Sequence, residues 1–219
     1  MSATVVIGAG GGIGAALADA IAEEGETVHR LTRAELELTD EAGIAAAAAR
    51  VGAPSRVIVA TGLLHEDGLG PEKSIRELDP AWLARQFAVN AIGPALVAKH
   101  FLPVMPRTGR TVFAVLSARV GSISDNRLGG WYGYRAAKAA LNQLVRTLAV
   151  EDRRRNERGI VVALHPGTVD TRLSKPFQQA GRDLFSPGRA AVQLLDVIDG
   201  LRPADSGRLF AWDGTEIAP

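Results

Sequence analysis

Tyr134 and Lys138 stand four residues apart in a segment predicted to be helical, so a phenol and an ammonium group share one helix face. A tyrosine with an ordinary pKa of about 10 is a poor acid or base at neutral pH, and a nearby cation lowers that pKa. A lowering of about two to three units needs roughly 3 to 4 kcal/mol, which a lysine and a cationic cofactor ring in a partly dry cleft could supply. The pair is therefore the candidate for acid–base chemistry, with a chance i, i+4 pair as the alternative.

The N-terminal run Val5–Gly14 is apolar up to Ile7 and then contains five glycines within seven residues. It predicts a strand, a phosphate-binding loop and the start of a helix, because this turn needs unusual φ angles and a close approach of backbone to ligand. The N-terminus of that helix would offer free N–H groups to an anion. A plain tight turn is the alternative. The loop residues expected to contact a dinucleotide are Gly8, Gly10, Gly11, Gly12, Ile13 and Gly14.

The end of the second predicted strand bears on the choice of cofactor. About 20 residues beyond the glycines, an acidic residue would bind the ribose 2′-hydroxyl of NAD, whereas a cation would accept the 2′-phosphate of NADP. The chain has Thr32 and Arg33 there and no acid at the strand end. A planar guanidinium suits a phosphate, so NADP (NADPH) is predicted in preference to NAD. An ordinary surface arginine is the alternative.

The elements that would position these residues alternate along the chain. Strands are predicted at 5–7, 27–32, 56–60, 111–116, 160–164 and 208–211, and helices after the glycine loop, after Asp40, and over 82–102, 131–155 and 188–199. Pro94 predicts a kink or break near Asn90. This alternation indicates a parallel α/β sheet with ligands at the carboxyl ends of its strands. Residues 1–219 suit one domain, and the aperiodic segment 171–187 is a candidate substrate flap.

Composition narrows the class of protein. Hydrophobic residues make up 47% and charged residues 22%, which is typical of a soluble globular protein and not of a disordered or fibrous one. A net charge of +1 argues against a dedicated nucleic-acid surface, and no 18-residue run is uninterruptedly apolar, so we expect no membrane span. Zero cysteines fits a cytoplasmic location, and the four scattered histidines lack metal-ligand spacing.

Taken together, the motifs resemble those of the short-chain dehydrogenase/reductase family. They occur in the family's order: the loop Gly8–Gly14, Asn90 in a long helix, a serine after the fourth strand, Tyr134 to Lys138, and Pro166 to Thr171. The stretches 60–65 and 121–132 look more narrowly like the C-factor and sniffer-type carbonyl reductase branch. The resemblance implies a single-domain Rossmann fold with a doubly wound, mostly parallel seven-stranded sheet flanked by helices. It also implies a homodimer or homotetramer built on the helices around 80–102 and 131–155.

The resemblance also implies roles for individual residues. Tyr134 would protonate a carbonyl oxygen as hydride reaches its carbon, Lys138 would hold the ribose hydroxyls of the nicotinamide nucleotide, and Asn90 would bind a water that relays protons. Segment 166–171 would border the nicotinamide. The catalytic set is then Asn90, Ser117, Tyr134 and Lys138, and the further cofactor-binding residues are Thr32, Arg33, Glu37, Leu38, Ala60, Thr61, Gly62, Pro166, Gly167, Val169 and Thr171.

The chain departs from the family pattern in three places. Ile7 stands where threonine is frequent, and Ala60-Thr61-Gly62 where Asn-Ala-Gly is common, so two structural hydrogen bonds are missing. Counting back from Gly121, the usual active-site serine falls on Ala118. Ser117 is favoured over Ser122 for that role, although successive strand residues face opposite ways, and either could be a loop-capping serine.

The residues and the resemblance together thus predict an NADPH-dependent oxidoreductase that reduces a ketone or aldehyde, a small-molecule substrate, by hydride transfer. The resemblance implies that the reaction is reversible to alcohol oxidation, with Tyr134 as general acid in one direction and general base in the other. The alternative is a nucleotide-sensing or signalling protein on the same scaffold, with little turnover.

Overall fold

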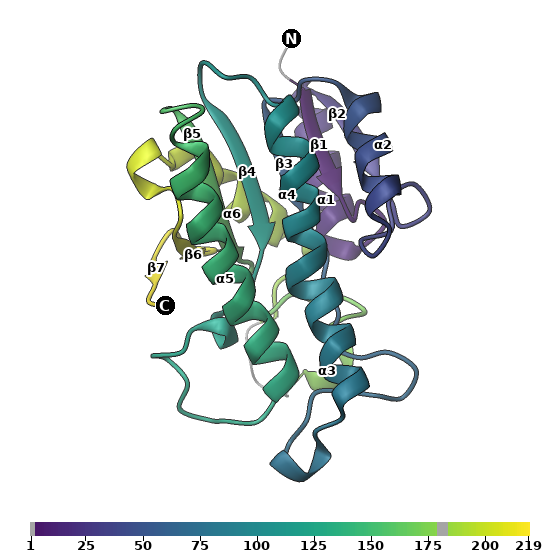
Figure 1. Cartoon of the computed structure of the whole chain (residues 1–219). Helices are drawn as coiled ribbons and strands as arrows, with labels where there is room; N and C mark the ends of the chain where they lie inside the picture. Colours follow the sequence, from purple (N-terminus) through teal and green to yellow (C-terminus); the bar gives the residue numbers. More distant parts are fainter. Residues whose placement is uncertain (1–2, 179–183) are drawn as a thin grey trace.

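The computed structural model describes residues 3–178 and 184–219, and its strands form one seven-stranded sheet within a single domain (Figure 1). The strand order is β2-β1-β3-β4-β5-β6-β7, parallel throughout except that β7 runs antiparallel to β6. This confirms the predicted doubly wound sheet. The strands are β1 (Ala3–Ile7), β2 (Thr27–Leu31), β3 (Arg56–Val59), β4 (Thr111–Leu116), β5 (Gly159–His165), β6 (Leu209–Ala211) and β7 (Glu216–Ile217).

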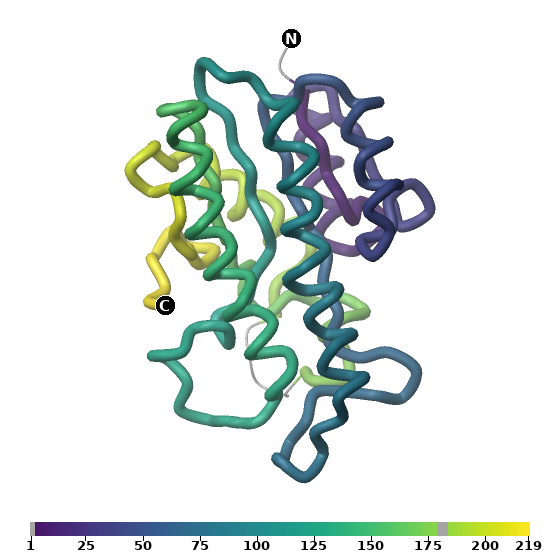
Figure 2. Tube along the Cα trace, viewed as in Figure 1, coloured from purple at the N-terminus to yellow at the C-terminus, as the bar shows by residue number. Residues whose placement is uncertain are grey.

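Helices cover both faces of the sheet, as the chain trace shows (Figure 2). Helices α1 and α6 pack together on one face, and α2, α4 and α5 cover the other. The start of α5 and all of α3 extend beyond the sheet at the lower edge in Figure 1. The helices are α1 (Gly12–Glu23), α2 (Glu41–Val51), α3 (Pro80–Phe87), α4 (Gly93–Phe101), α5 (Tyr132–Asp152) and α6 (Pro187–Gly200).

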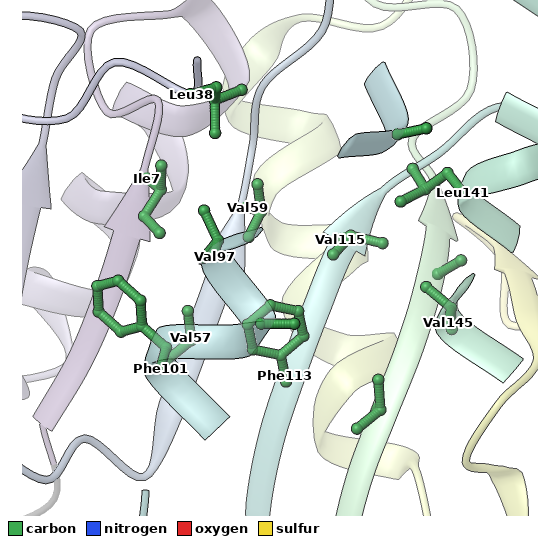
Figure 3. Packing of buried hydrophobic residues seen from close by; sticks show 14 of the residues in the cluster. Ile7, Leu38, Val57, Val59, Val97, Phe101, Phe113, Val115, Leu141 and Val145 are labelled. Carbon is green, nitrogen blue, oxygen red and sulfur yellow. The ribbon is translucent and has the colours of Figure 1, made fainter. Parts of the chain in front are cut away.

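Successive strand residues feed two separate cores, because neighbouring side chains point to opposite faces of a sheet. Val57 and Val59 face α4, whereas Ile58 between them faces α1 and α6. Figure 3 shows the first of these cores, in which Phe101 and Phe113 are fully buried against the valines. Burial on both faces explains why these strands read as continuous apolar runs in the sequence.

The long helix predicted over 82–102 is broken where Pro94 suggested. A π-helical turn, Ala88–Ile92, separates α3 from α4. Asp79 caps α3 through its Oδ1, which accepts a hydrogen bond from the Trp82 N–H at 2.7 Å. Because Pro94 has no N–H, the carbonyl of Asn90 lacks its usual donor four residues on. The predicted irregularity at Asn90 is confirmed, and π turns of this kind are frequent at functional sites.

Other details differ from the sequence prediction. The two-residue strand β7 was not expected from its pattern, and Asp40 stands at the N-cap of α2 without a side-chain capping bond among the described residues. The helical stretch Pro80–Val104 is long and apolar enough by composition to cross a membrane. It is the one such helix among the described residues, and 50% of its apolar window is buried within the protein, as in a core helix.

Candidate active site

The parallel topology gathers the predicted site residues at one edge of the sheet. The glycine loop follows β1, Thr32 follows β2, Thr61 follows β3, and the loop at Pro166 follows β5. The strand order reverses direction at β1, since β2 lies on one side of it and β3 on the other. Ligands of doubly wound sheets bind in the crevice at that switch point, outside the carboxyl ends of the strands.

The loop after β1 has an open anion-binding shape. Gly8 has a φ of +86°, and a Cβ there would lie 2.8 Å from the Ala60 carbonyl oxygen, so only glycine fits. The three glycines 10–12 are exposed, and the fully described first turn of α1 carries no acidic side chain. A Cβ on Gly12 would lie 3.0 Å from Thr171 Cγ2, which places Thr171 beside the loop. A diphosphate fits this loop because free N–H groups face it without a competing carboxylate.

Arg33 follows β2, and its exposed side chain is accessible to a phosphate. Its side chain is 77% exposed and lies 3.8 Å from Glu37 in an ion pair. Glu35, which the sequence analysis did not single out, accepts hydrogen bonds from the Thr32 N–H at 2.8 Å and hydroxyl at 3.0 Å. Those bonds hold the pKa of Glu35 below its usual value. Leu38 is buried, at 6% exposure, so only part of it could reach an adenine.

Tyr134 and Lys138 both lie on α5, the helix that the sequence predicted for them, and both are buried. Lys138 Nζ donates a hydrogen bond to the Leu116 carbonyl at the end of β4, 2.8 Å away, and lies 5.8 Å from the Tyr134 ring centroid. Burial raises the pKa of Tyr134 to about 12 and lowers the pKa of Lys138 to about 7. The tyrosine shift is opposite to the lowering proposed from sequence, because desolvation outweighs a lysine that is itself easily neutralised.

Asn90 ties the loop after β3 to the π turn. Its side-chain oxygen accepts from the Leu63 N–H at 2.9 Å, and its Nδ2 donates to the Leu63 carbonyl at 2.8 Å and to Gln86 Oε1 at 2.9 Å. Both polar atoms of the Asn90 side chain therefore form hydrogen bonds within the protein. The backbone carbonyl of Asn90, to which Pro94 cannot donate, is the group that could bind a water. Thr61 nearby has a buried hydroxyl without a partner among the described residues, which a ligand could supply.

The hydroxyl groups of both candidate serines form hydrogen bonds within the protein. Ser117 Oγ donates to Asn142 Oδ1 at 2.7 Å, and Asn142 lies two turns of α5 beyond Tyr134, about 12 Å along the axis. Ser122 Oγ accepts from the Asp125 N–H and closes a loop turn. Ala118, the residue after Ser117, belongs instead to the hydrophobic cluster of Tyr134. We therefore leave Ser117 out of the proposed catalytic set, because the strand pleat turns its hydroxyl toward Asn142.

An apolar and aromatic wall surrounds the Tyr134 ring. Trp131 lies edge-on to Tyr134, with ring centroids 6.3 Å apart, and to Phe177 at 5.5 Å. His65 packs on the other side of Phe177 at 5.7 Å. Phe177 is not among the residues predicted for the site, because its proximity to Tyr134 depends on tertiary folding. The remaining members of this wall are Leu64, Ala118, Val120 and Leu173.

The segment predicted as a flap, 171–187, is pinned at both ends. Phe185 N–H donates to the Thr168 carbonyl at 2.9 Å, and Asp170 N–H donates to the Phe185 carbonyl at 2.8 Å. Gly167 has a φ of +78° and packs against Phe185. Residues 179–183 of the predicted flap lie outside the described residues. Within 3–178 and 184–219, no cluster of three or more metal-ligating side chains occurs.

Comparisons with known proteins agree with this geometry. Residues 15–192 match the family model described as enoyl-(acyl carrier protein) reductase. The chain is 39% identical over 145 residues to the protein named C-signal of Myxococcus xanthus, covering 66% of this chain and 82% of that one. These matches bear out the resemblance stated from the motifs.

Solved structures show the same fold. The carbonyl reductase Sniffer of D. melanogaster superposes with a TM-score of 0.84 at 21% identity, covering 100% of this chain and 99% of that one. An NADPH-bound carbonyl reductase from chicken fatty liver gives a TM-score of 0.83 at 24% identity, covering 100% and 94%. At these identities the likeness is one of architecture.

Replacing Lys138 by methionine should change how stability depends on pH. Because the pKa of Lys138 falls from 10.5 to about 7 on folding, the unfolded chain holds an extra proton between those pH values. Wild-type stability at this residue therefore rises with pH, by about 1 kcal/mol per pH unit between pH 7 and 9. The Lys138→Met variant should lose that rise, measured by urea unfolding at pH 7, 8 and 9. Parallel pH profiles for the two proteins would contradict the buried, neutralised lysine.

Proposed function

This chain belongs to the short-chain dehydrogenase/reductase family, and we propose that it reduces an apolar ketone or aldehyde with NADPH. The observation that carries the proposal is the buried Tyr134–Lys138 pair, facing an apolar wall at the sheet edge that also bears the open glycine loop. The NADPH-bound structure of the chicken carbonyl reductase supports the choice of cofactor.

The residues present fit a dinucleotide at this edge. The N–H groups at the start of α1 would hold the diphosphate, and Arg33 would pair with a 2′-phosphate. Lys138 has N–H donors beyond the one given to Leu116, and these would hold ribose hydroxyls. Thr171, next to Gly12, would contact the carboxamide. A bound nicotinamide supplies the hydride.

Tyr134 would act as the acid. At neutral pH a phenol with a pKa of about 12 stays protonated, so it can donate its proton to a carbonyl oxygen as negative charge develops there. Lys138 would hold the phenolate that results, because a cation stabilises that charge. The carbonyl of Asn90, to which Pro94 cannot donate, would accept a hydrogen bond from a water that returns a proton to the site.

The wall around Tyr134 points to an apolar substrate. Trp131 lies edge-on to Tyr134 and Phe177, and Leu64, Ala118 and Leu173 belong to the same hydrophobic cluster. A charged substrate would lose its hydration there without a partner. We therefore propose a carbonyl compound with an alkyl or aryl group against Trp131 and Phe177. The pinned segment 171–187 is proposed as the substrate flap, and the homodimer or homotetramer stays a prediction for sedimentation analysis.

Two observations favour a second candidate, a signalling protein that binds the nucleotide with little turnover. The relative of highest identity reported above is named C-signal, and Ala118 occupies the position where the family's active-site serine usually falls. The intact Tyr134 and Lys138 favour the enzyme.

Tyr134→Phe should separate catalysis from cofactor binding. It removes one hydroxyl and keeps the ring, so turnover of apolar aldehydes and ketones should fall by at least about 1000-fold, as for loss of general-acid chemistry. The NADPH dissociation constant, measured by cofactor fluorescence, should stay within about twofold, well under the tenfold that 1.4 kcal/mol represents. Retained turnover would refute the role of Tyr134. Tight NADPH binding by a wild type that turns over no carbonyl compound would instead favour the signalling candidate.

Arg33→Ala should weaken NADPH binding selectively. Loss of a charge-assisted phosphate contact should raise the NADPH dissociation constant by about tenfold and leave that of NADH unchanged. Arg30→Ala is the matched control, because Arg30 is another β2-region arginine that pairs with Asp19 instead. Equal changes for both cofactors in Arg33→Ala would rule out a 2′-phosphate contact.

Ala118→Ser should raise turnover. The new hydroxyl would lie beside the Tyr134 ring and give the carbonyl oxygen a second hydrogen bond. We expect kcat to increase by about five- to tenfold, in line with a hydrogen bond worth about 1 kcal/mol in the transition state. Steady-state kinetics on the same substrate panel checks this. A loss of activity would show that the wall needs a methyl group at this position.

A further inference from the structure

Glu72 is a buried carboxylate that the proposed chemistry does not use. It lies in the loop before α3 and is 2% exposed. Its Oε2 accepts a hydrogen bond from the Gly133 N–H, 3.0 Å away and 61 residues along the chain. Its backbone carbonyl accepts another from the Trp131 N–H. Glu72 thus satisfies two donors at the start of α5, one turn or less from Tyr134.

The start of α5 needs this outside support. Trp131 occupies the N-cap position, where its indole makes no capping bond within the described chain. Its φ and ψ of 54° and 42° are left-handed, and Gly129 and Gly130 before it also have a φ of 64°. A left-handed tryptophan is strained and persists only where neighbours hold it. The indole in turn packs against Tyr134 and Phe177, so the Trp131 backbone sets the wall of the site.

Gln86 is a second buried side chain that lies, like Glu72, close to Gly133. A Cβ on Gly133 would lie 2.9 Å from Glu72 Oε1 and 3.4 Å from Gln86 Cγ, so both side chains converge on this glycine. Glu72 Oε1 and Gln86 Nε2 are each buried without a partner among the described residues. One is an acceptor and the other a donor. Gln86 Oε1 is already bound by Asn90 Nδ2.

We propose that Glu72 is a positioning residue that fixes Tyr134 relative to Asn90, acting on the first through Gly133 and on the second through Gln86. The inference rests on the proposed function, since it concerns the same site. In this arrangement the unpartnered Gln86 Nε2 donates to the unpartnered Glu72 Oε1, and the carboxylate then joins the entry of α5 to the π turn.

The order of donors and acceptors makes the proposal specific. In the proposed arrangement Glu72 accepts from Gln86 Nε2, and Gln86 Oε1 accepts from Asn90 as observed. In Glu72→Gln, an amide that keeps its oxygen on Gly133 would turn a donor toward the Gln86 donor. If Gln86 flipped to relieve this, its nitrogen would face the Asn90 nitrogen. The double variant Glu72→Gln/Gln86→Glu restores a complementary order, because the new amide at position 72 could donate to the new carboxylate at position 86, which could also accept from Asn90.

The experiment compares wild type, Glu72→Gln, the double variant and Glu77→Gln. Glu77 is the matched control, since its carboxylate also accepts a backbone N–H, from Lys73 at 2.9 Å in the same loop, but is exposed. We measure kcat and KM on an apolar aldehyde, the NADPH dissociation constant, and amide hydrogen exchange over residues 131–134. Glu72→Gln should lower kcat about tenfold, leave NADPH binding within about twofold, and speed exchange over 131–134 several-fold.

The double variant should recover at least about half of the lost kcat and the slow exchange, because it restores the pairing between positions 72 and 86. Unchanged kcat in Glu72→Gln, or a double variant no better than the single one, would overturn the proposal. If Glu72→Gln does not fold, the double variant tests the proposal. Recovery of kcat and of slow exchange would support it, and failure to recover them would overturn it. If wild type turns over no carbonyl compound, the proposed function fails by itself. Hydrogen exchange then decides on Glu72, and wild-type exchange over 131–134 in Glu72→Gln counts against it.

Discussion

The burial of one lysine organises this site. Lys138 is 2% exposed, and its ammonium has a single protein acceptor in the described structure, the Leu116 carbonyl at the end of β4. One hydrogen bond cannot offset the desolvation of a full charge, which is why the pKa of Lys138 falls to about 7. Ribose hydroxyls would give the remaining donors partners. The loop after β4 packs closely on the backbone of Lys138. A Cβ on Gly121 in that loop would lie 2.8 Å from the Lys138 backbone, so glycine allows this close packing.

The broken helix supplies the opposite side of the site. Because Pro94 cannot donate, the chain takes an extra residue into a π turn, and Asn90 is fixed there by the loop after β3. Helix α3 packs on α5 close to Tyr134, with Gly133 at a point where a Cβ would also lie 3.0 Å from Leu83. The phenol therefore lies on a junction of three segments far apart in sequence. Its position depends on backbone contacts and buried amides more than on its own hydrogen bonds.

Local patterns in the sequence predicted those parts of the fold that depend mainly on neighbouring residues in the chain. Apolar runs, the glycine loop and Pro94 predicted the strands, the phosphate loop and the break at Asn90, because each depends on neighbours in the chain. The direction of the Ser117 hydroxyl could not be predicted, because it depends on the pleat at the end of β4 and on Asn142, 25 residues away. Phe177 and Glu72 reach the site only through tertiary packing, and no periodicity marks such residues. Strand β7, two residues long, is too short to show alternation.

The state of the phenol bears on the direction of the reaction. With a pKa of about 12, Tyr134 would need about 7 kcal/mol to lose its proton at pH 7, since each unit corresponds to 1.36 kcal/mol. Alcohol oxidation begins with that phenolate, whereas carbonyl reduction begins with the phenol already present. An oxidised nicotinamide carries a positive charge and would lower the pKa of Tyr134, but the reduced ring carries none. Under the proposed function, burial keeps the proton on Tyr134, so the site would begin from the phenol that carbonyl reduction uses.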